Sequence, residues 1–307
     1  MIESAKSTAT GYSEFVKRAH LRKAEPSMDN LTGREPDDAL NTPEPWDGLL
    51  ASAGPRDHIV QLYQDQQFLN RAVCRFAAGA IANGEGVILV PTAAHWEAFR
   101  PRLEAEGVDV KDAQRNGQLT VVDADELLPR FMKNAMPDAP VFLGLAADVI
   151  SKARGETRYP KVRWWGEMVN VLWEQGNVAA SMSLEDQFDR LAKHHEIAIF
   201  CSFVMDNFNS EVHSRLLPRL GQNHSHLIPV EDYARLERAV GDALRQTVGA
   251  DDARVLEQQL LSNSASAFQM PRSQALLLAL RESLPEVAES VLARSRALYH
   301  GSREPAL

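Results

Sequence analysis

The stretch Gly86-Val-Ile-Leu-Val90 decides the fold class of this chain of 307 residues. Its apolar side chains follow one another without a polar residue, and the turn pair Asn83-Gly84 lies just before it. A short apolar run of this kind is typical of a strand that is buried on both faces of a parallel sheet. Residues 65–83 before it and residues 92–106 after it carry helical patterns. The run is therefore predicted to be a buried strand between two helices.

The same alternation of strand and helix patterns continues along the chain. Further strands are predicted at 58–63, 118–123, 161–165 and 197–203, and further helices at 125–136, 140–154, 166–175 and 183–194. Strands that alternate with helices of this length indicate three layers around a largely parallel sheet. From residue 230 onward only helical patterns follow, at 233–247, 251–261, 272–283 and 284–299. The predicted fold class is therefore α/β, with a C-terminal helical region.

Three parts of the chain differ in composition. Residues 1–55 hold five prolines, many acidic residues and few aliphatic ones. Such a segment cannot bury enough apolar surface to offset the entropy of ordering it. We predict a disordered, flexible N-terminal tail at 1–55 with one short helix at 13–23, and a partner-binding arm is the alternative. The α/β domain then covers 56–229, and 230–307 forms a helical appendage or a dimerisation element.

The charge and the cysteine content exclude several classes of protein. A net charge of −9 argues against nonspecific nucleic-acid binding, which needs clustered lysine and arginine, and against a polybasic membrane anchor. No run of about 18 apolar residues is present, so no transmembrane helix is expected. The two cysteines are too few for a disulfide framework and fit a reducing compartment. We expect a cytoplasmic protein that binds neither nucleic acid nor membrane.

The sequence lacks the common catalytic and cofactor motifs. The junction at 62–68, between the first strand and its helix, has no glycine and no lysine, so it cannot form a P-loop. The glycines at 79, 84 and 86 precede a strand, which is the wrong context for a dinucleotide-binding fingerprint. No G-x-S-x-G nucleophile motif occurs. We therefore expect no catalytic residue, no cofactor and no enzymatic activity.

Candidate binding residues follow from the rule that open α/β sheets bind ligands at the carboxyl ends of their strands. Glu167 follows Trp165-Gly166 where a strand becomes a helix, and there it would face the positive end of that helix. Cys201 is assigned to the end of an apolar strand, although a small buried hydrophobic residue is the alternative. The predicted ligand-binding residues are Tyr63, Asp65, Thr92, His95, Glu167 and Cys201, and a second group around them is Glu85, Asp123, Trp173, Glu185 and His224.

Glu185 has a structural alternative, and the histidine pairs of the sequence need a test for metal binding. For Glu185 the favoured explanation is an acidic residue in the first turn of a helix that Ser183 caps. The adjacent His194 and His195 point to different faces of a helix end and would chelate a metal poorly. His224-Ser-His226 would place both rings on one side of an extended chain, but no third ligand lies nearby in sequence. We therefore expect no metal site.

Several segments together resemble the MEDS domain, a sensory domain of methanogens and methylotrophs. They are His58-Ile-Val-Gln-Leu-Tyr63, Asn83-Gly-Glu-Gly-Val-Ile-Leu-Val90, Thr92-x-x-His95, Gly117-Gln-Leu-x-x-x-Asp123, Gly166-Glu-Met-Val, Leu172-Trp-x-x-Gly176-Asn177, Leu184-Glu185, Cys201 and His224-Ser. The resemblance covers about 58–229. It implies a RecA-like α/β domain that has lost its P-loop, and a role in sensing small organic ligands. The DNA-binding or histidine-kinase modules that often accompany this family are not recognised in 230–307.

These observations lead to three hypotheses for function. The first is a non-catalytic sensory protein that binds a small organic ligand or a partner at the carboxyl edge of the sheet and regulates a downstream protein. Its partners would be a kinase, a sigma-factor pathway component or another regulator, and the helical region would support a homo-oligomer. The second is a protein-partner scaffold or anti-sigma-type regulator without a small-molecule ligand. The third is a divergent nucleotide-dependent enzyme.

Overall fold

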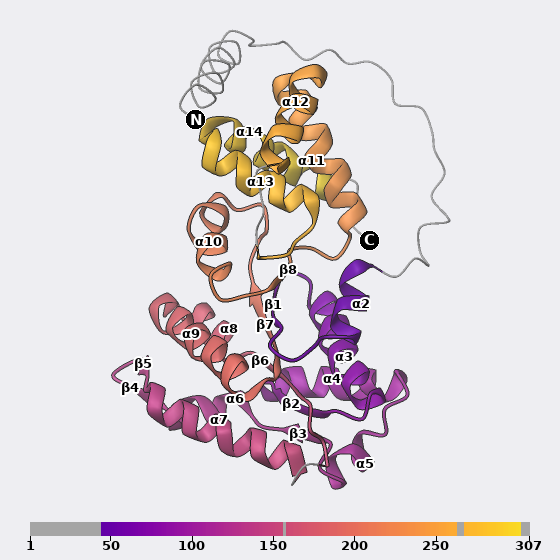
Figure 1. Cartoon of the computed structure of the whole chain (residues 1–307), viewed down its shortest axis with the longest axis vertical. Helices are drawn as coiled ribbons and strands as arrows, with labels where there is room; N and C mark the ends of the chain where they lie inside the picture. Colours follow the sequence, from indigo (N-terminus) through magenta and orange to yellow (C-terminus); the bar gives the residue numbers. More distant parts are fainter. Residues whose placement is uncertain (1–43, 156–157, 263–266, 302–307) are drawn as a thin grey trace, which may run out of the picture.

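The computed structural model describes residues 44–155, 158–262 and 267–301, and it places the α/β domain beside a C-terminal bundle of helices (Figure 1). In this described part, six parallel strands form one sheet in the order β3-β2-β6-β7-β1-β8. Their bounds are β1 His58–Tyr63, β2 Gly86–Val90, β3 Leu119–Val121, β6 Val162–Gly166, β7 Ala198–Val204 and β8 His226–Ile228. The α/β fold predicted from the sequence is confirmed.

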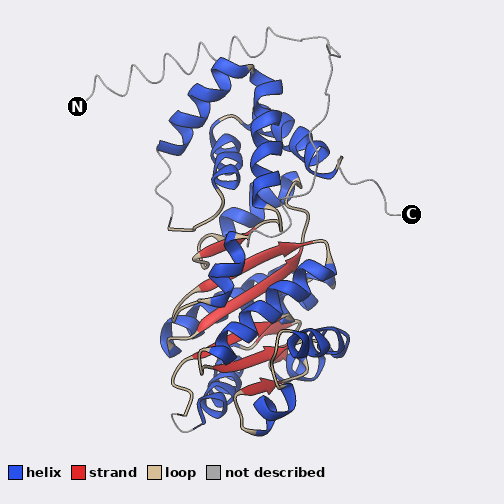
Figure 2. Ribbon diagram, turned by 90° about the vertical axis from the view of Figure 1, so that its right-hand side faces the viewer, coloured by secondary structure: helices blue, strands red, loops and turns tan. Residues whose placement is uncertain are grey.

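Helices cover both faces of the sheet (Figure 2). In β1, Val60 and Leu62 face one layer while Ile59 and Tyr63 face the other, because successive side chains of a strand alternate. The layer on Ile59 holds α2 Pro45–Ala51, α3 Gln66–Ala82, α4 Ala93–Ala105 and α5 Val110–Arg115. The layer on Val60 holds α6 Ala124–Leu127, α7 Ala139–Arg154, α8 Met168–Glu174, α9 Val178–His195 and α10 Leu217–Leu220.

Local sequence explains where the main helices begin. The carboxylate of Asp65 accepts a hydrogen bond from the backbone N–H of Gln67 and so caps α3. Asp138 caps α7 by accepting from Val141, and Asn177 caps α9 by accepting from Ala180. Each cap satisfies a backbone donor that the first turn of a helix leaves without a partner.

The predicted helix at 125–136 is wrong over most of its length. Helix α6 ends at Leu127, and a short 3-10 turn at Leu128–Arg130 follows it. Two short strands, β4 Met132–Lys133 and β5 Met136–Pro137, then form an antiparallel hairpin. The two residues between them have φ angles of 52° and 60°, which a helix does not allow. An apolar pattern over so few turns could not distinguish these elements from one helix.

Two further boundaries differ from the prediction. Helix α9 begins at Val178 rather than at Ser183, so Ser183 lies inside the helix and is not its N-cap. Strand β8, the edge strand beside β1, was not predicted, because a strand of three residues leaves almost no sequence signal. A single turn of π-helix at Val212–Leu216, before α10, was not predicted either.

Part of the predicted N-terminal tail belongs to the core. Residues Pro45–Ala51 form α2, whose Trp46 and Leu50 are buried against α3. The indole N–H of Trp46 donates a hydrogen bond of 2.8 Å to the backbone carbonyl of Glu231, so α2 also supports the loop after β8. The tail prediction is therefore wrong for this segment, and the helix predicted at 13–23 lies outside the described residues.

The C-terminal helical region has a core of its own and packs on the carboxyl edge of the sheet. It consists of α11 Tyr233–Val248, α12 Ala250–Ser262, α13 Arg272–Ser283 and α14 Pro285–His300. The buried amide of Asn207 donates a hydrogen bond of 2.9 Å to the buried side chain of Gln274. Asp206 forms an ion pair of 3.0 Å with Arg296. Among the described residues, no helix is both long enough and apolar enough to cross a membrane.

Candidate functional site

Three of the predicted binding residues meet where β2 and β6 end. Glu167 follows β6, and its buried carboxylate accepts a hydrogen bond from the backbone N–H of Thr92. The other carboxylate oxygen contacts Nδ1 of His95, one turn into α4. The Nε2 atom of His95 lies 2.9 Å from the side-chain oxygen of Gln66 at the start of α3. The parallel strands thus bring Thr92, His95 and Glu167 into one cluster, although they come from two loops that are about 75 residues apart in the sequence.

The electrostatics of this cluster favour a charged pair. The hydrogen bond to Glu167 raises the pKa of His95 above its ordinary value of 6.5, while partial burial opposes this shift. Both ring nitrogens of His95 face oxygen acceptors, and only the protonated ring can donate from both. Burial, followed by the charges of Glu167 and Glu174, raises the pKa of the nearby Tyr63 hydroxyl well above its usual range. Tyr63 therefore stays neutral beside an imidazolium–carboxylate pair.

A cavity of about 80 Å³ lies next to this cluster, where β1, β7 and β8 end. Tyr63 and Asp65 line it from β1 and from the cap of α3. Residues 205–208 after β7 and 229–231 after β8 form its sides. Tyr299 and His300, at the end of α14, complete the lining. The sheet and the helical region therefore share the walls of one cavity.

The lining of the cavity limits the chemistry of an occupant. Phe68, Met205 and Phe208 supply apolar surface. The acidic groups are Asp65, Asp206 and Glu231, of which Asp206 pairs with Arg296 and Glu231 pairs with Arg71. Arg296 and Arg71 already pair with these carboxylates, so neither arginine is free to hold an anion in the cavity. The cavity therefore favours a small neutral or cationic molecule over an anion.

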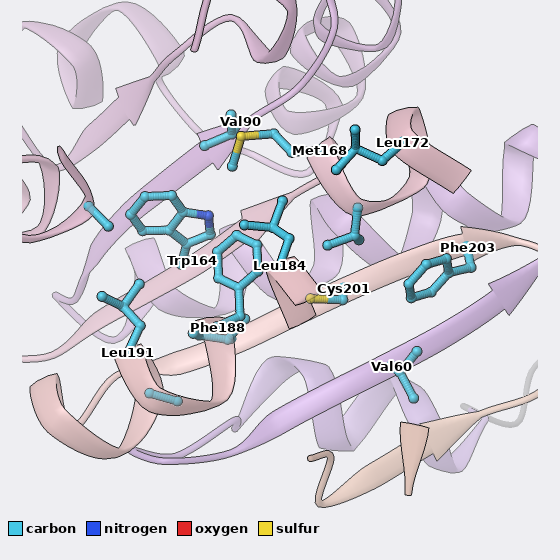
Figure 3. Close-up of a cluster of buried hydrophobic side chains, with 14 of the residues drawn as sticks. Val60, Val90, Trp164, Met168, Leu172, Leu184, Phe188, Leu191, Cys201 and Phe203 are labelled. Atoms are coloured by element: carbon cyan, nitrogen blue, oxygen red, sulfur yellow. The ribbon is translucent and has the colours of Figure 1, made fainter. Parts of the chain in front are cut away.

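Cys201 does not lie at the ligand-binding edge. Strand β7 continues for three residues beyond it, and the side chain points into the core between the sheet and α9 (Figure 3). The prediction that it ends a strand is wrong, because Ser202-Phe203-Val204 extends the same strand. Burial raises the pKa of its thiol well above the usual range, so Cys201 is not a free nucleophile.

The second group of predicted residues is distributed over four places. Glu85 precedes β2 at the opposite edge of the sheet, where its carboxylate lies 2.5 Å from Nε of the buried Arg163. Asp123 caps α6 by accepting from two backbone N–H groups. Trp173 packs edge-on against Phe203 at a ring distance of 6.2 Å.

Glu185 and His224, the remaining two, lie with Cys201 and His58 in a buried cluster under α9. The Glu185 carboxylate is 3.4 Å from Nε2 of His58 and 3.3 Å from Nε2 of His224. Burial lowers the pKa of His58, with the neighbouring His224 acting in the same direction. The first-turn explanation of Glu185 is wrong, because the residue lies two turns inside α9.

Sequence reasoning missed three polar residues of these sites. Gln66 contacts His95 across the edge, and Asn170 links two elements by accepting a hydrogen bond of 2.8 Å from the backbone of Val204. Asn170 lies one turn after Glu167, so the strand-end rule extended by one helical turn would have found it. His58 lies at the beginning of β1, and a rule that searches only strand ends excludes it.

A family model matches residues 57–218, which is more than half of the chain. It describes the MEthanogen/methylotroph, DcmR Sensory domain, abbreviated MEDS. The chain belongs to the MEDS family. A search of the curated proteins found no match.

The MEDS match extends from β1 to the beginning of α10. It includes the cluster around Glu167 and the β1 and β7 sides of the cavity, but not β8 or α14. MEDS is a sensory domain family, which supports a sensory or regulatory role for this chain. The cavity therefore combines residues of the MEDS match with residues from outside the matched region.

The junction between β1 and α3 in this MEDS domain disfavours phosphate. The Asp65 carboxylate accepts from the backbone N–H of Gln67 at the start of α3, where a P-loop would hold phosphate oxygens. An anion there would meet a negative charge and would find its N–H donor already engaged. Descent from a RecA-type sheet stays a prediction.

Proposed function

We propose that this MEDS protein is a non-catalytic sensor that binds a small organic molecule in the cavity at the carboxyl edge of the sheet. Ligand binding would then alter how the helical region sits on the MEDS domain, and the helical region would act on a downstream protein. The observation that carries this proposal is the shared cavity, with Tyr63 and Asp65 on one side and the end of α14 on the other.

Because both the sheet and α14 line the cavity, a bound ligand can affect how the helical region docks on the MEDS domain. A ligand shifts a conformational equilibrium only by its difference in affinity between the two states. A molecule that contacts both the sheet and α14 has full contacts only while the helical region is docked. It would therefore stabilise the docked arrangement, which the Asn207–Gln274 hydrogen bond and the Asp206–Arg296 ion pair also hold.

The cluster around Glu167 would act beside the ligand rather than on it. Tyr63 connects this cluster to the cavity, because its hydroxyl interacts with the side chain of Gln66, which in turn contacts His95. Burial and the negative charge of Glu167, which pairs with His95, keep the Tyr63 hydroxyl in its neutral form at the wall of the cavity. We propose positioning roles for Thr92, His95 and Glu167.

The test uses matched small probes and NMR. Butylammonium, butanol and butyrate share one carbon chain and differ in charge, and they are titrated into the isotope-labelled protein. Because small ligands gain at most about 1.5 kcal/mol per heavy atom, the five heavy atoms of the amine or the alcohol correspond to a Kd no tighter than about 3 μM. We expect the amine or the alcohol to shift resonances of Tyr63, Met205 and α14, and butyrate to shift them least.

A cavity-filling variant separates specific binding from general solvent effects. Val230→Phe fills the cavity and should abolish the shifts, whereas Val255→Phe on the exposed face of α12 should leave them unchanged. Shifts that persist in Val230→Phe, or probes that never perturb residues of the cavity, would contradict the proposal. The second result would favour a regulator that binds only protein partners.

A further inference from the structure

Four metal-binding side chains meet in the core, away from the cavity. His58 comes from the first position of β1, Cys201 from the middle of β7, Glu185 from α9 and His224 from the loop before β8. Each is at most 5% exposed. Their ligand atoms all lie within 4.8 Å of one another. Nothing in the proposed sensing function uses this group.

The two histidines are oriented with the same ring nitrogen toward the centre. Nδ1 of His58 lies 2.9 Å from the backbone carbonyl of Asn223, and Nδ1 of His224 lies 2.8 Å from that of Leu220. A carbonyl oxygen can only accept, so each Nδ1 carries a proton, and each Nε2 is directed toward the Glu185 carboxylate. Metal-bound histidines usually have this arrangement, with one nitrogen donating to a carbonyl and the other on the ion.

The carboxylate at the centre is held only by long contacts. Its oxygen Oε2 lies 3.4 and 3.3 Å from Nε2 of His58 and His224, and neither oxygen has a hydrogen bond of good geometry among the described residues, although Glu185 is 1% exposed. The Nε2 atom of His224 has no hydrogen-bond partner there either. An ionised carboxylate left so deep in the core is costly unless an opposite charge accompanies it. The Glu185 carboxylate therefore needs a positive charge beside it, which either a protonated histidine ring or a bound cation can supply.

Three of the six distances among the four ligand atoms match those around a tetrahedral ion, and all six are within 4.8 Å. Around Zn²⁺, with bonds of ~2.0–2.1 Å to nitrogen or oxygen and ~2.3 Å to sulfur, neighbouring ligand atoms are ~3.3–3.4 Å apart, or ~3.6 Å where one is sulfur. Glu185 lies 3.4 Å from His58 and 3.3 Å from His224, and Sγ of Cys201 lies 3.5 Å from Nε2 of His58. The two imidazole rings stack at 3.8 Å and would have to open as an ion enters.

We propose that His58, Glu185, Cys201 and His224 form a closed structural site for a divalent transition-metal ion of the Zn²⁺ type. On binding, the thiol of Cys201 releases its proton to solvent, and its sulfur lone pair forms the bond to the ion. One thiolate, one carboxylate and two neutral imidazoles then carry two negative charges, which cancel those of the ion. All four positions come from the protein, which is typical of structural rather than catalytic sites.

Metal analysis of the purified full-length protein tests this site. We expect one zinc per chain, and a loss of at least roughly 100-fold in Zn²⁺ affinity in Cys201→Ser and in Glu185→Gln, because each removes a direct ligand. Cys74→Ser is the matched control, since Cys74 is also buried but lies under α4, where its thiol faces the Phe99 carbonyl. Circular dichroism checks that each variant folds.

Cobalt provides a second measurement that does not depend on the variants. Chelator-treated wild-type protein titrated with Co²⁺ should show the sulfur-to-metal charge-transfer band and the intense visible bands of a tetrahedral site. A wild-type chain that gains neither signal, or that binds Zn²⁺ no tighter than folded Glu185→Gln, would overturn the proposal. A chain that loses zinc equally in Cys74→Ser would do so as well.

Discussion

The His95–Glu167 pair leads to a prediction about stability and pH. In Glu167→Gln the amide oxygen can still accept from the Thr92 N–H, but the charge opposite His95 is lost. A hydrogen bond between charged groups contributes about 1.5–3 kcal/mol where it is shielded from water. Glu167 is 2% exposed and the His95 side chain is 20% exposed, so screening reduces this value only modestly. We therefore expect Glu167→Gln to lower the free energy of unfolding by about 2 kcal/mol at pH 6.

The sign of the pH dependence follows from the direction of the pKa shift. Glu167 raises the pKa of folded His95 above 6.5, so the folded state holds this proton more tightly than the unfolded chain. The stabilisation is fully present below pH 6.5 and is lost as the pH rises through the folded pKa. The difference between wild type and Glu167→Gln should accordingly be larger at pH 6 than at pH 9.

Urea denaturation at pH 6 and pH 9, together with an NMR titration of the His95 ring, measures both quantities. Glu97→Gln is the control, because Glu97 lies on the same helix as His95 and forms an exposed ion pair with Arg100. It should cost under about 0.5 kcal/mol and leave the His95 titration unchanged. If Glu167→Gln costs the same at both pH values, or if wild-type His95 titrates at or below 6.5, the assignment of a charged pair is refuted.

Three further substitutions test the buried contacts that hold the domain and its helical region together. Arg163→Met leaves the Glu85 carboxylate without its buried cation and should cost about 3–5 kcal/mol in urea denaturation; a loss under 1 kcal/mol would show that this ion pair is not needed. Gly79→Ala would place a Cβ 2.6 Å from the backbone carbonyl of Ala51, and we expect a loss of about 1–3 kcal/mol with faster proteolysis before α2. Gln274→Leu leaves a buried amide donor without its acceptor and should cost about 1–3 kcal/mol, with increased hydrogen exchange between the helical region and the sheet; unchanged exchange would argue against its role in docking.

The sequence predicts the central strands well because both of their faces are buried. A run such as Gly86–Val90 can be recognised without knowing which strands lie beside it, because a short continuous apolar pattern is typical of a strand buried on both faces. The hairpin at β4 and β5 was missed for the opposite reason, because its strands have two residues each and their pairing is set by contacts with α9. Helix α2 was missed because its few apolar residues are buried only against a helix that follows later in the chain.

Some residues of the candidate site could be predicted from the sequence, and others could not. The strand-end rule selected Thr92, His95 and Glu167 because each follows its strand within a few residues, and the geometry of a parallel sheet then brings them together. It misplaced Cys201, because the strand predicted at 197–203 already continued past this residue and its true end is at Val204. The partners of Cys201 come from α9, from the beginning of β1 and from the loop before β8, and no short spacing connects those positions.

The cavity and the buried cluster lie at opposite ends of the same two strands. His58 begins β1 and Tyr63 ends it, while His224 precedes β8 and Val230 follows it. A strand of six residues separates its ends by only about 17–20 Å. An ion that fixes the beginning of both strands would reduce the freedom of the loop that forms one wall of the cavity. If so, linkage requires that a cavity ligand and Zn²⁺ change each other's affinity by the same factor. The Kd of the amine or alcohol probe, measured on zinc-loaded and chelator-treated protein, determines that factor; equal values would show that the two sites are independent.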